Sequence, residues 1–269
     1  MSRIQDKFLE LKSKNQKAFI AYAMAGYPND KETISIIRSL VNGGADIVEI
    51  GLPFSDPLAD GPVIQNASFQ ALQKGMNLYR FLKIVKKIRS GTDIPLVLMT
   101  YANLVYSQGY DKFISAIKKA GIDGVILPDM AIEEAEEYLK IIHKNKMDAI
   151  FLISPNTSQE RIKRIAKASS GFVYLVSTYG TTGGTQQQFQ RYTLDAVKNA
   201  KKILGDKLPL GVGFGVNNPE QARSILKTGA DAIIVASAIL RLIANTPKAK
   251  VHSKIVSFVK NLKKTTISE

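Results

Sequence analysis

The chain has 269 residues, of which 45% are hydrophobic and 22% charged, and its formal net charge is +14 at pH 7. This composition is typical of a globular protein with a sizeable core, and it excludes disordered and fibrous chains. The absence of cysteine excludes disulfides, and together with a histidine count of 2 it argues against a zinc or iron–sulfur site. We therefore expect chemistry based on carboxylates, hydroxyls and backbone groups, with no metal.

The N-terminal residues 1–14 are charged from the start and contain no apolar run, which predicts a cytoplasmic protein without a signal peptide. No window approaches the roughly 18 apolar residues of a membrane span. The pattern of residues 3–14 predicts an extra helix that caps the N-terminal mouth of the fold. Lysines recur as scattered pairs without interleaved aromatic residues, which favours a solvated basic surface over the alternative of nucleic-acid binding.

Short aliphatic runs alternate with amphipathic segments of 10 to 15 residues, which is typical of parallel strands joined by helices. Their mean spacing of about 30 residues matches one strand–helix unit. We predict a single (β/α)₈ TIM barrel over residues 1–269, as one domain, with a closing helix at 247–264. The predicted strands are 18–24, 46–50, 95–100, 123–127, 148–153, 172–177, 209–213 and 231–235.

Three segments repeat one local pattern, in which a glycine is followed two residues later by an aspartate and then by a strand. They are 44–48, 121–125 and 229–233. The glycine suits the end of a helix and the aspartate suits a turn. The pattern indicates one supersecondary unit used three times.

A carboxylate stands at the end of the second predicted strand, before a loop stiffened by proline and glycine. Glu49 lies between Val48 and Ile50, so it points inward if those two residues face the helices. Burial there would raise its pKa toward the range of a general acid or base. The alternative is a structural hydrogen bond to a neighbouring strand, but barrel enzymes place their sites at such strand ends.

The ends of the seventh and eighth strands carry features that suit an anion. Gly213 and Gly215 would let backbone amides approach a phosphate, and Ser237 begins the next helix. A glycine-rich turn without a ligand is the alternative. The end of the sixth strand, residues 177–188, is rich in glycine, threonine and glutamine, which suits either a lid over the substrate or a long surface loop.

The stretch from Val48 to Gln65 closely resembles the signature of the tryptophan synthase α chains, nearly position for position. Further matches span the chain, at residues 25–28, 101–105, 127–129, 174–183 and 213–216. The resemblance implies a lyase that cleaves indole-3-glycerol phosphate to indole and glyceraldehyde 3-phosphate in tryptophan biosynthesis. It implies that Glu49 is the general acid/base and that Asp60 accepts the indole N–H.

The resemblance also assigns roles to the residues around these carboxylates. The substrate-binding residues it implies are Tyr22, Met99, Tyr101, Ile126, Tyr174 and Thr182. The phosphate-binding residues are Gly183, Gly213, Phe214, Gly215, Ala236 and Ser237, with alanine at 236 where the family usually has glycine. Pro53 and Asp56 would meet the β subunit in an α₂β₂ heterotetramer, in which pyridoxal phosphate belongs to the β subunit and this chain needs no cofactor.

Two rival interpretations remain open at this stage. Another phosphate-binding barrel enzyme would share the glycines and Ser237 but would have no use for the acidic loop after the second strand. A regulatory subunit with little activity of its own would bind the β chain without needing the pair Glu49 and Asp60. The presence of both carboxylates favours the enzyme.

Overall fold

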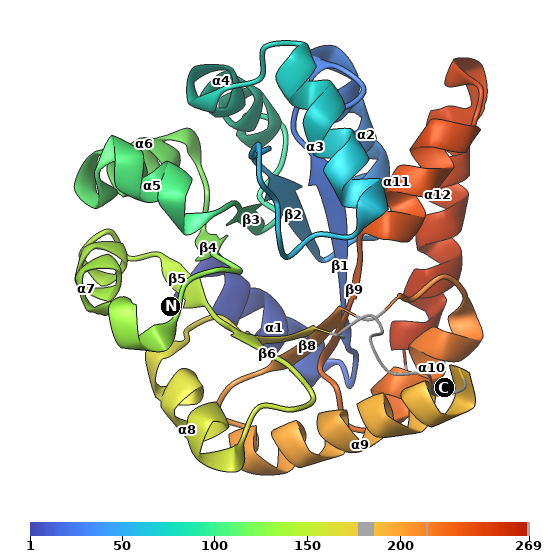
Figure 1. Ribbon diagram of the computed structural model, residues 1–269. Helices are drawn as coiled ribbons and strands as arrows, with labels where there is room; N and C mark the ends of the chain where they lie inside the picture. The colour runs from blue at the N-terminus through green and yellow to red at the C-terminus, as the bar shows by residue number, and fades with distance from the viewer. Residues whose placement is uncertain (177–185, 214, 268–269) are drawn as a thin grey trace.

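The computed structural model describes residues 1–176, 186–213 and 215–267, in which parallel strands alternate with helices. The strands are β1 (Ala18–Met24), β2 (Ile47–Gly51), β3 (Leu96–Met99), β4 (Gly124–Ile126), β5 (Asp148–Ile150), β6 (Leu152–Ile153), β7 (Val173–Val176), β8 (Leu210–Gly213) and β9 (Ala232–Val235). Figure 1 shows the helices arranged as a ring around these strands.

The helices of the ring cover the strands in chain order. They are α2 (Asp30–Gly43), α3 (Pro62–Gln73), α4 (Leu78–Arg89), α5 (Ala102–Gln108), α6 (Tyr110–Ala120), α7 (Glu136–Lys144), α8 (Gln159–Ala168), α9 (Gln186–Leu204), α10 (Pro219–Lys227), α11 (Ser237–Asn245) and α12 (Lys248–Lys263). Two short 3₁₀ turns are also present, η1 (Ile132–Glu134) and η2 (Lys264–Thr266). No helix in the described ranges is long and apolar enough to cross a membrane.

The strands form one parallel sheet in the order β5-β4-β3-β2-β1-β9-β8-β7-β6. Its two edge strands are consecutive in the chain and are separated by Phe151 alone, so the sheet closes into the predicted barrel. The prediction of one strand over 148–153 was wrong in this detail, because the segment is split into β5 and β6. Among the described residues, the first piece pairs with β4 and the second with β7. The side chain of Phe151 packs against Tyr138 of α7.

Several strands divide their alternate residues between two separate cores. In β2, Val48 and Ile50 pack among residues of the surrounding helices, whereas Ile47 belongs to the cluster inside the barrel. Glu49 has the same parity as Ile47 and therefore points inward, as the alternation predicted. The strand thus carries its carboxylate toward the barrel axis.

The predicted extra helix is present as α1 (Arg3–Ser13), which crosses the barrel in Figure 1. Its apolar residues Ile4, Phe8 and Leu11 join the interior cluster of the barrel. Arg3 pairs at 2.9 Å with Asp123, the residue just before β4. A side-chain hydrogen bond of 2.5 Å joins Ser2 to Asp148, the first residue of β5. Because these contacts lie at strand starts, α1 closes the N-terminal end and leaves the C-terminal end for the site.

The three glycine–aspartate units have one common geometry. Gly44, Gly121 and Gly229 each take a φ near +100° after a helix, a conformation that favours glycine. The aspartate that follows accepts a hydrogen bond from one backbone N–H of the neighbouring strand and from at least one basic side chain. These pairs are Asp46 with Phe19 and Lys263, Asp123 with Leu96 and Arg89, and Asp231 with Leu210 and Lys201. Paired carboxylates at the strand starts therefore hold the N-terminal end together.

Candidate active site

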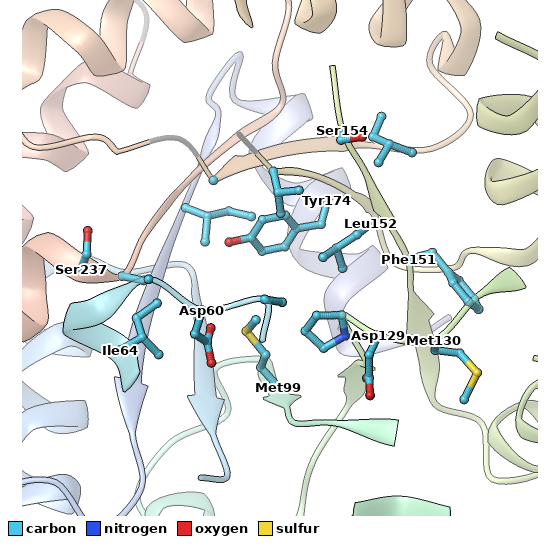
Figure 2. A pocket seen from close by; sticks show the side chains of 18 of the residues that line it. Asp60, Ile64, Met99, Asp129, Met130, Phe151, Leu152, Ser154, Tyr174 and Ser237 are labelled. Carbon is cyan, nitrogen blue, oxygen red and sulfur yellow. The ribbon is translucent and has the colours of Figure 1, made fainter. Parts of the chain in front are cut away.

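A cavity of about 1070 Å³ opens at the carboxyl ends of the strands. Figure 2 shows Asp60, Met99 and Tyr174 on its wall, with Ser237 at one end and Met130 and Phe151 at the other. Among the residues singled out from the sequence, the cavity is lined by Asp60, Met99, Tyr174, Gly213, Gly215, Ala236 and Ser237. These residues come from the ends of several strands, which is the usual arrangement of a barrel active site.

Glu49 lies on β2, in register with Tyr22 of β1 and Val97 of β3, and only 1% of it is exposed. Its Oε2 atom has no hydrogen-bond partner among the described residues. Burial raises the pKa of Glu49 to about 8, and the negative charge of Asp60 adds to this effect. The side chain is therefore mainly protonated at neutral pH and can give a proton.

Asp60 lies in the loop between β2 and α3 and lines the cavity. Burial raises its pKa to about 6, while a hydrogen bond from the hydroxyl of Tyr101 lowers it. At neutral pH Asp60 is therefore mainly ionised, unlike Glu49. The site thus combines a proton donor with a proton acceptor, a separation of roles that acid–base catalysis requires.

Two buried tyrosines pack against glycines of neighbouring strands. A Cβ atom on Gly51 would lie 2.1 Å from the hydroxyl oxygen of Tyr22, and one on Gly213 would lie 2.3 Å from that of Tyr174. Burial, with the nearby carboxylates, raises the pKa of both tyrosines well above 10. Gly213, singled out for its backbone amide, therefore also makes space for Tyr174, a role that the sequence analysis missed.

The apolar wall includes Met99, which is partly exposed to the cavity. Ile126 is fully buried and pairs in register with Met99, but it is not among the residues that line the cavity. Tyr101 is buried and directs its hydroxyl to Asp60. Met99 therefore reaches the cavity directly, whereas the prediction of ligand contact for Ile126 and Tyr101 stays a prediction.

The end of the cavity at Ser237 suits an anion. Helix α11 begins at Ser237, and no described side chain caps the amide groups of its first turn. Unpaired N–H groups and the helix dipole favour negative charge at such a place. Ala236 and Gly215 line the cavity beside Ser237. The structure therefore brings these three predicted residues together.

Arg241 is a cavity residue that the sequence analysis missed. It follows Ser237 by one helical turn, and its guanidinium donates to Oδ1 of Asn217 at 2.7 Å. Asn217 in turn donates to the carbonyl of Gly215 at 2.6 Å. The spacing of four residues from Ser237 was the available signal, since residues four apart share a helix face. Arg241 adds positive charge to the anion end.

Several predicted positions lie elsewhere. Thr182, Gly183 and Phe214 lie outside the described residues, as does most of the predicted lid at 177–188. In the loop after β2, Pro53 is buried and Asp56 is exposed. The predicted contacts of these five residues therefore stay predictions.

A family model described as tryptophan synthase alpha chain matches residues 8–267. The tryptophan synthase alpha chain of Methanosarcina acetivorans is 43% identical over 244 residues, covering 90% of this chain and 86% of its own length. That of Petrotoga mobilis is 42% identical over 265 residues, covering 98% and 99%.

Solved structures agree with this match. A protein from Aquifex aeolicus superposes with a TM-score of 0.90 at 36% identity, covering 100% of both chains. A chain of the tryptophan synthase complex from Pyrococcus furiosus has a TM-score of 0.83 at 34% identity, covering 92% of this chain and 98% of its own. The (β/α)₈ barrel is confirmed, and the chain belongs to the tryptophan synthase alpha chain family, a family of lyases.

Proposed function

We propose that this chain cleaves indole-3-glycerol phosphate to indole and glyceraldehyde 3-phosphate as the α subunit of tryptophan synthase. The observation that carries the proposal is the pair Glu49 and Asp60, two carboxylates of different pKa at one strand exit. The cavity that Asp60 lines has an apolar wall at Met99 and an anion end at Ser237. These features match an indole ring, a cleavable chain and a phosphate.

In the proposed reaction, Glu49 gives its proton to C3 of the indole while Asp60 accepts the indole N–H proton, which yields an indolenine. The Glu49 carboxylate then removes the proton of the hydroxyl next to C3. The electron pair of the bond between C3 and the side chain moves into the ring, so this bond breaks and the carbon that bore the hydroxyl becomes an aldehyde. Asp60 returns its proton to nitrogen, and every proton is accounted for.

The two pKa values support this division of roles. Between pH 6 and 8 the prevailing state has protonated Glu49 and ionised Asp60, as the first step needs. Tyr22 and Tyr174 stay protonated beside them, because burial raises the pKa of both.

We infer a β subunit as the partner of this chain, in an α₂β₂ assembly in the cytoplasm. The similarity to a chain of the tryptophan synthase complex from Pyrococcus furiosus supports a partner. Asp56 is exposed on the loop that also carries Asp60, and Leu58 on the same loop is 93% exposed. This chain then needs no cofactor of its own, and pyridoxal phosphate belongs to the partner that condenses indole with serine.

The test is indole release from indole-3-glycerol phosphate, with and without purified β subunit. We expect Glu49→Gln and Asp60→Asn each to abolish turnover, while the substrate still binds to Glu49→Gln, because the cavity is retained and the transferable proton is lost. The matched control is Asp93→Asn, which removes an exposed carboxylate before β3 and should leave the rate unchanged. Near-wild-type turnover by Glu49→Gln would refute the mechanism.

The same assay separates the rival functions. A regulatory subunit would stimulate the β subunit equally well with or without Glu49, and would release no indole alone. A different phosphate-binding barrel enzyme would bind phosphate esters without an indole ring as tightly as the indole substrate. The buried Glu49 and its position next to Asp60 favour the lyase.

A further inference from the structure

Tyr101 contacts the loop that carries Asp60 at three points. Its hydroxyl oxygen accepts a hydrogen bond from the backbone N–H of Ala59 at 3.1 Å. The same hydroxyl donates to Oδ2 of Asp60 at 3.1 Å. Its ring stacks on Phe54, with 5.3 Å between ring centroids and 23° between ring planes. One side chain therefore fixes both ends of the acidic loop.

The direction of the hydroxyl bond follows from this geometry. A tyrosine hydroxyl has one proton, and because the Ala59 amide supplies the proton of its own bond, the Tyr101 proton is free for the carboxylate. Burial and the charge of Asp60 raise the pKa of Tyr101 above its usual value, so the hydroxyl keeps that proton. Tyr101 thus binds Asp60 as a donor to an ionised acceptor, which is a strong class of hydrogen bond.

The backbone around Tyr101 is fixed by its neighbours. The buried Thr100 donates its hydroxyl to the carbonyl of Leu52 at 3.2 Å. The amide of Ala102, which opens α5, donates to Oδ1 of Asp129 at 2.9 Å. Tyr101 therefore stands on a backbone that is tied to the exits of both β2 and β4, whereas Asp60 stands on a loop.

We infer that Tyr101 is a positioning residue of the reaction, whose hydroxyl holds Asp60 in the orientation that receives the indole N–H. It acts by binding Oδ2, which leaves Oδ1 of Asp60 for the substrate. The inference rests on the proposed function, because it takes Asp60 as the acceptor. It differs from the role implied by the family resemblance, in which Tyr101 contacts the substrate.

The first experiment replaces Tyr101 by phenylalanine, which keeps the ring and removes the hydroxyl. A hydrogen bond to a charged group contributes about 1.5–3 kcal/mol, so kcat/KM for indole release should fall about 10- to 100-fold, mainly through kcat. The acid limb of the pH profile should move to higher pH, because loss of a donor to the carboxylate raises the pKa of Asp60. The control is Tyr106→Phe on α5, where Tyr106 is 70% exposed, and it should leave the profile unchanged.

The second experiment measures binding of an indole joined to a phosphate through a three-carbon chain without hydroxyl groups, which cannot be cleaved. Its Kd is determined for wild type, Tyr101→Phe, Asp60→Asn and the double variant. We expect Tyr101→Phe to weaken binding when Asp60 is present and to have no effect in the Asp60→Asn background. If Tyr101 acts only through Asp60, its substitution has no further effect once Asp60 has been replaced. A thermal unfolding midpoint close to wild type for Tyr101→Phe would show that the fold is retained.

Two results would overturn the inference. An equal loss of binding in both backgrounds would mean that Tyr101 contacts the ligand itself. An unchanged kcat and acid limb in Tyr101→Phe would mean that the hydroxyl does not set the orientation of Asp60. If Asp60→Asn alone retained full turnover, the proposed function would fail, whereas inactive Asp60→Asn with normal Tyr101→Phe would refute only this inference.

Discussion

The rate of indole release should depend on pH in a bell shape that is set by Glu49 and Asp60. Asp60 must be ionised, and its pKa is about 6, so kcat/KM should rise as the pH increases through 6. Glu49 must be protonated, and its pKa is about 8, so kcat/KM should fall as the pH increases through 8. With these two values, about 80% of the enzyme is in the active ionisation state at pH 7, and about 10% is at pH 5 or pH 9.

The assay is kcat/KM measured from pH 5 to pH 9 with indole-3-glycerol phosphate at constant ionic strength. The apparent pKa values belong to the pair, because each carboxylate affects the other.

The Asp60→Asn variant offers a check that does not depend on turnover. Since the charge of Asp60 raises the pKa of Glu49, a carboxyl-labelled Glu49 followed by NMR should titrate at lower pH in that variant. A flat rate profile, or a Glu49 that titrates near pH 4.5 in the wild type, would refute the assignment.

Three further predictions concern packing, charge and stability. Gly213→Ala should destabilise the protein by about 1–3 kcal/mol in urea unfolding, because its Cβ would overlap Tyr174, whereas Gly91→Ala has room and should be tolerated. Arg241→Gln should raise KM about fivefold at low salt and less at high salt, as kinetics at two ionic strengths would show. Glu49 retains its proton in the folded state between pH 4.5 and about 8, so it lowers stability as the pH rises through that window. Glu49→Gln should therefore raise the free energy of unfolding by about 4 kcal/mol at pH 8 and by little at pH 5, measured by urea unfolding.

Much of the fold could be predicted because each strand–helix unit has its own local signals. The alternation of Val48, Glu49 and Ile50 was sufficient to turn the carboxylate inward, since side chains alternate across a strand. The division of 148–153 at Phe151 could not be predicted, because it reflects which neighbour each half-strand pairs with. An apolar run in the sequence is the same whether the whole strand pairs with both neighbours or each half pairs with a different neighbour.

A feature of the site could be predicted where it depends on a local sequence pattern. It could not be predicted where it depends on a contact between residues that are distant in the sequence. Ser237 follows a strand and opens a helix, which is a local pattern. The bond between Tyr101 and Asp60 joins residues 41 positions apart, and nothing in either local sequence indicates it. The space that Gly213 leaves for Tyr174 is also a contact between strands, so the glycine alone suggested only its amide.

The different pKa values of the two carboxylates follow from where the barrel places each of them. Glu49 belongs to a strand buried between β1 and β3, so it cannot move toward water, and burial raises its pKa without a described donor to Oε2 that would oppose the rise. Asp60 belongs to a loop, where the hydroxyl of Tyr101 can reach it and lower its pKa. A second carboxylate on β2 would be buried like Glu49 and would also remain protonated at neutral pH. The division between strand and loop therefore yields an acid and a base at the same strand exit.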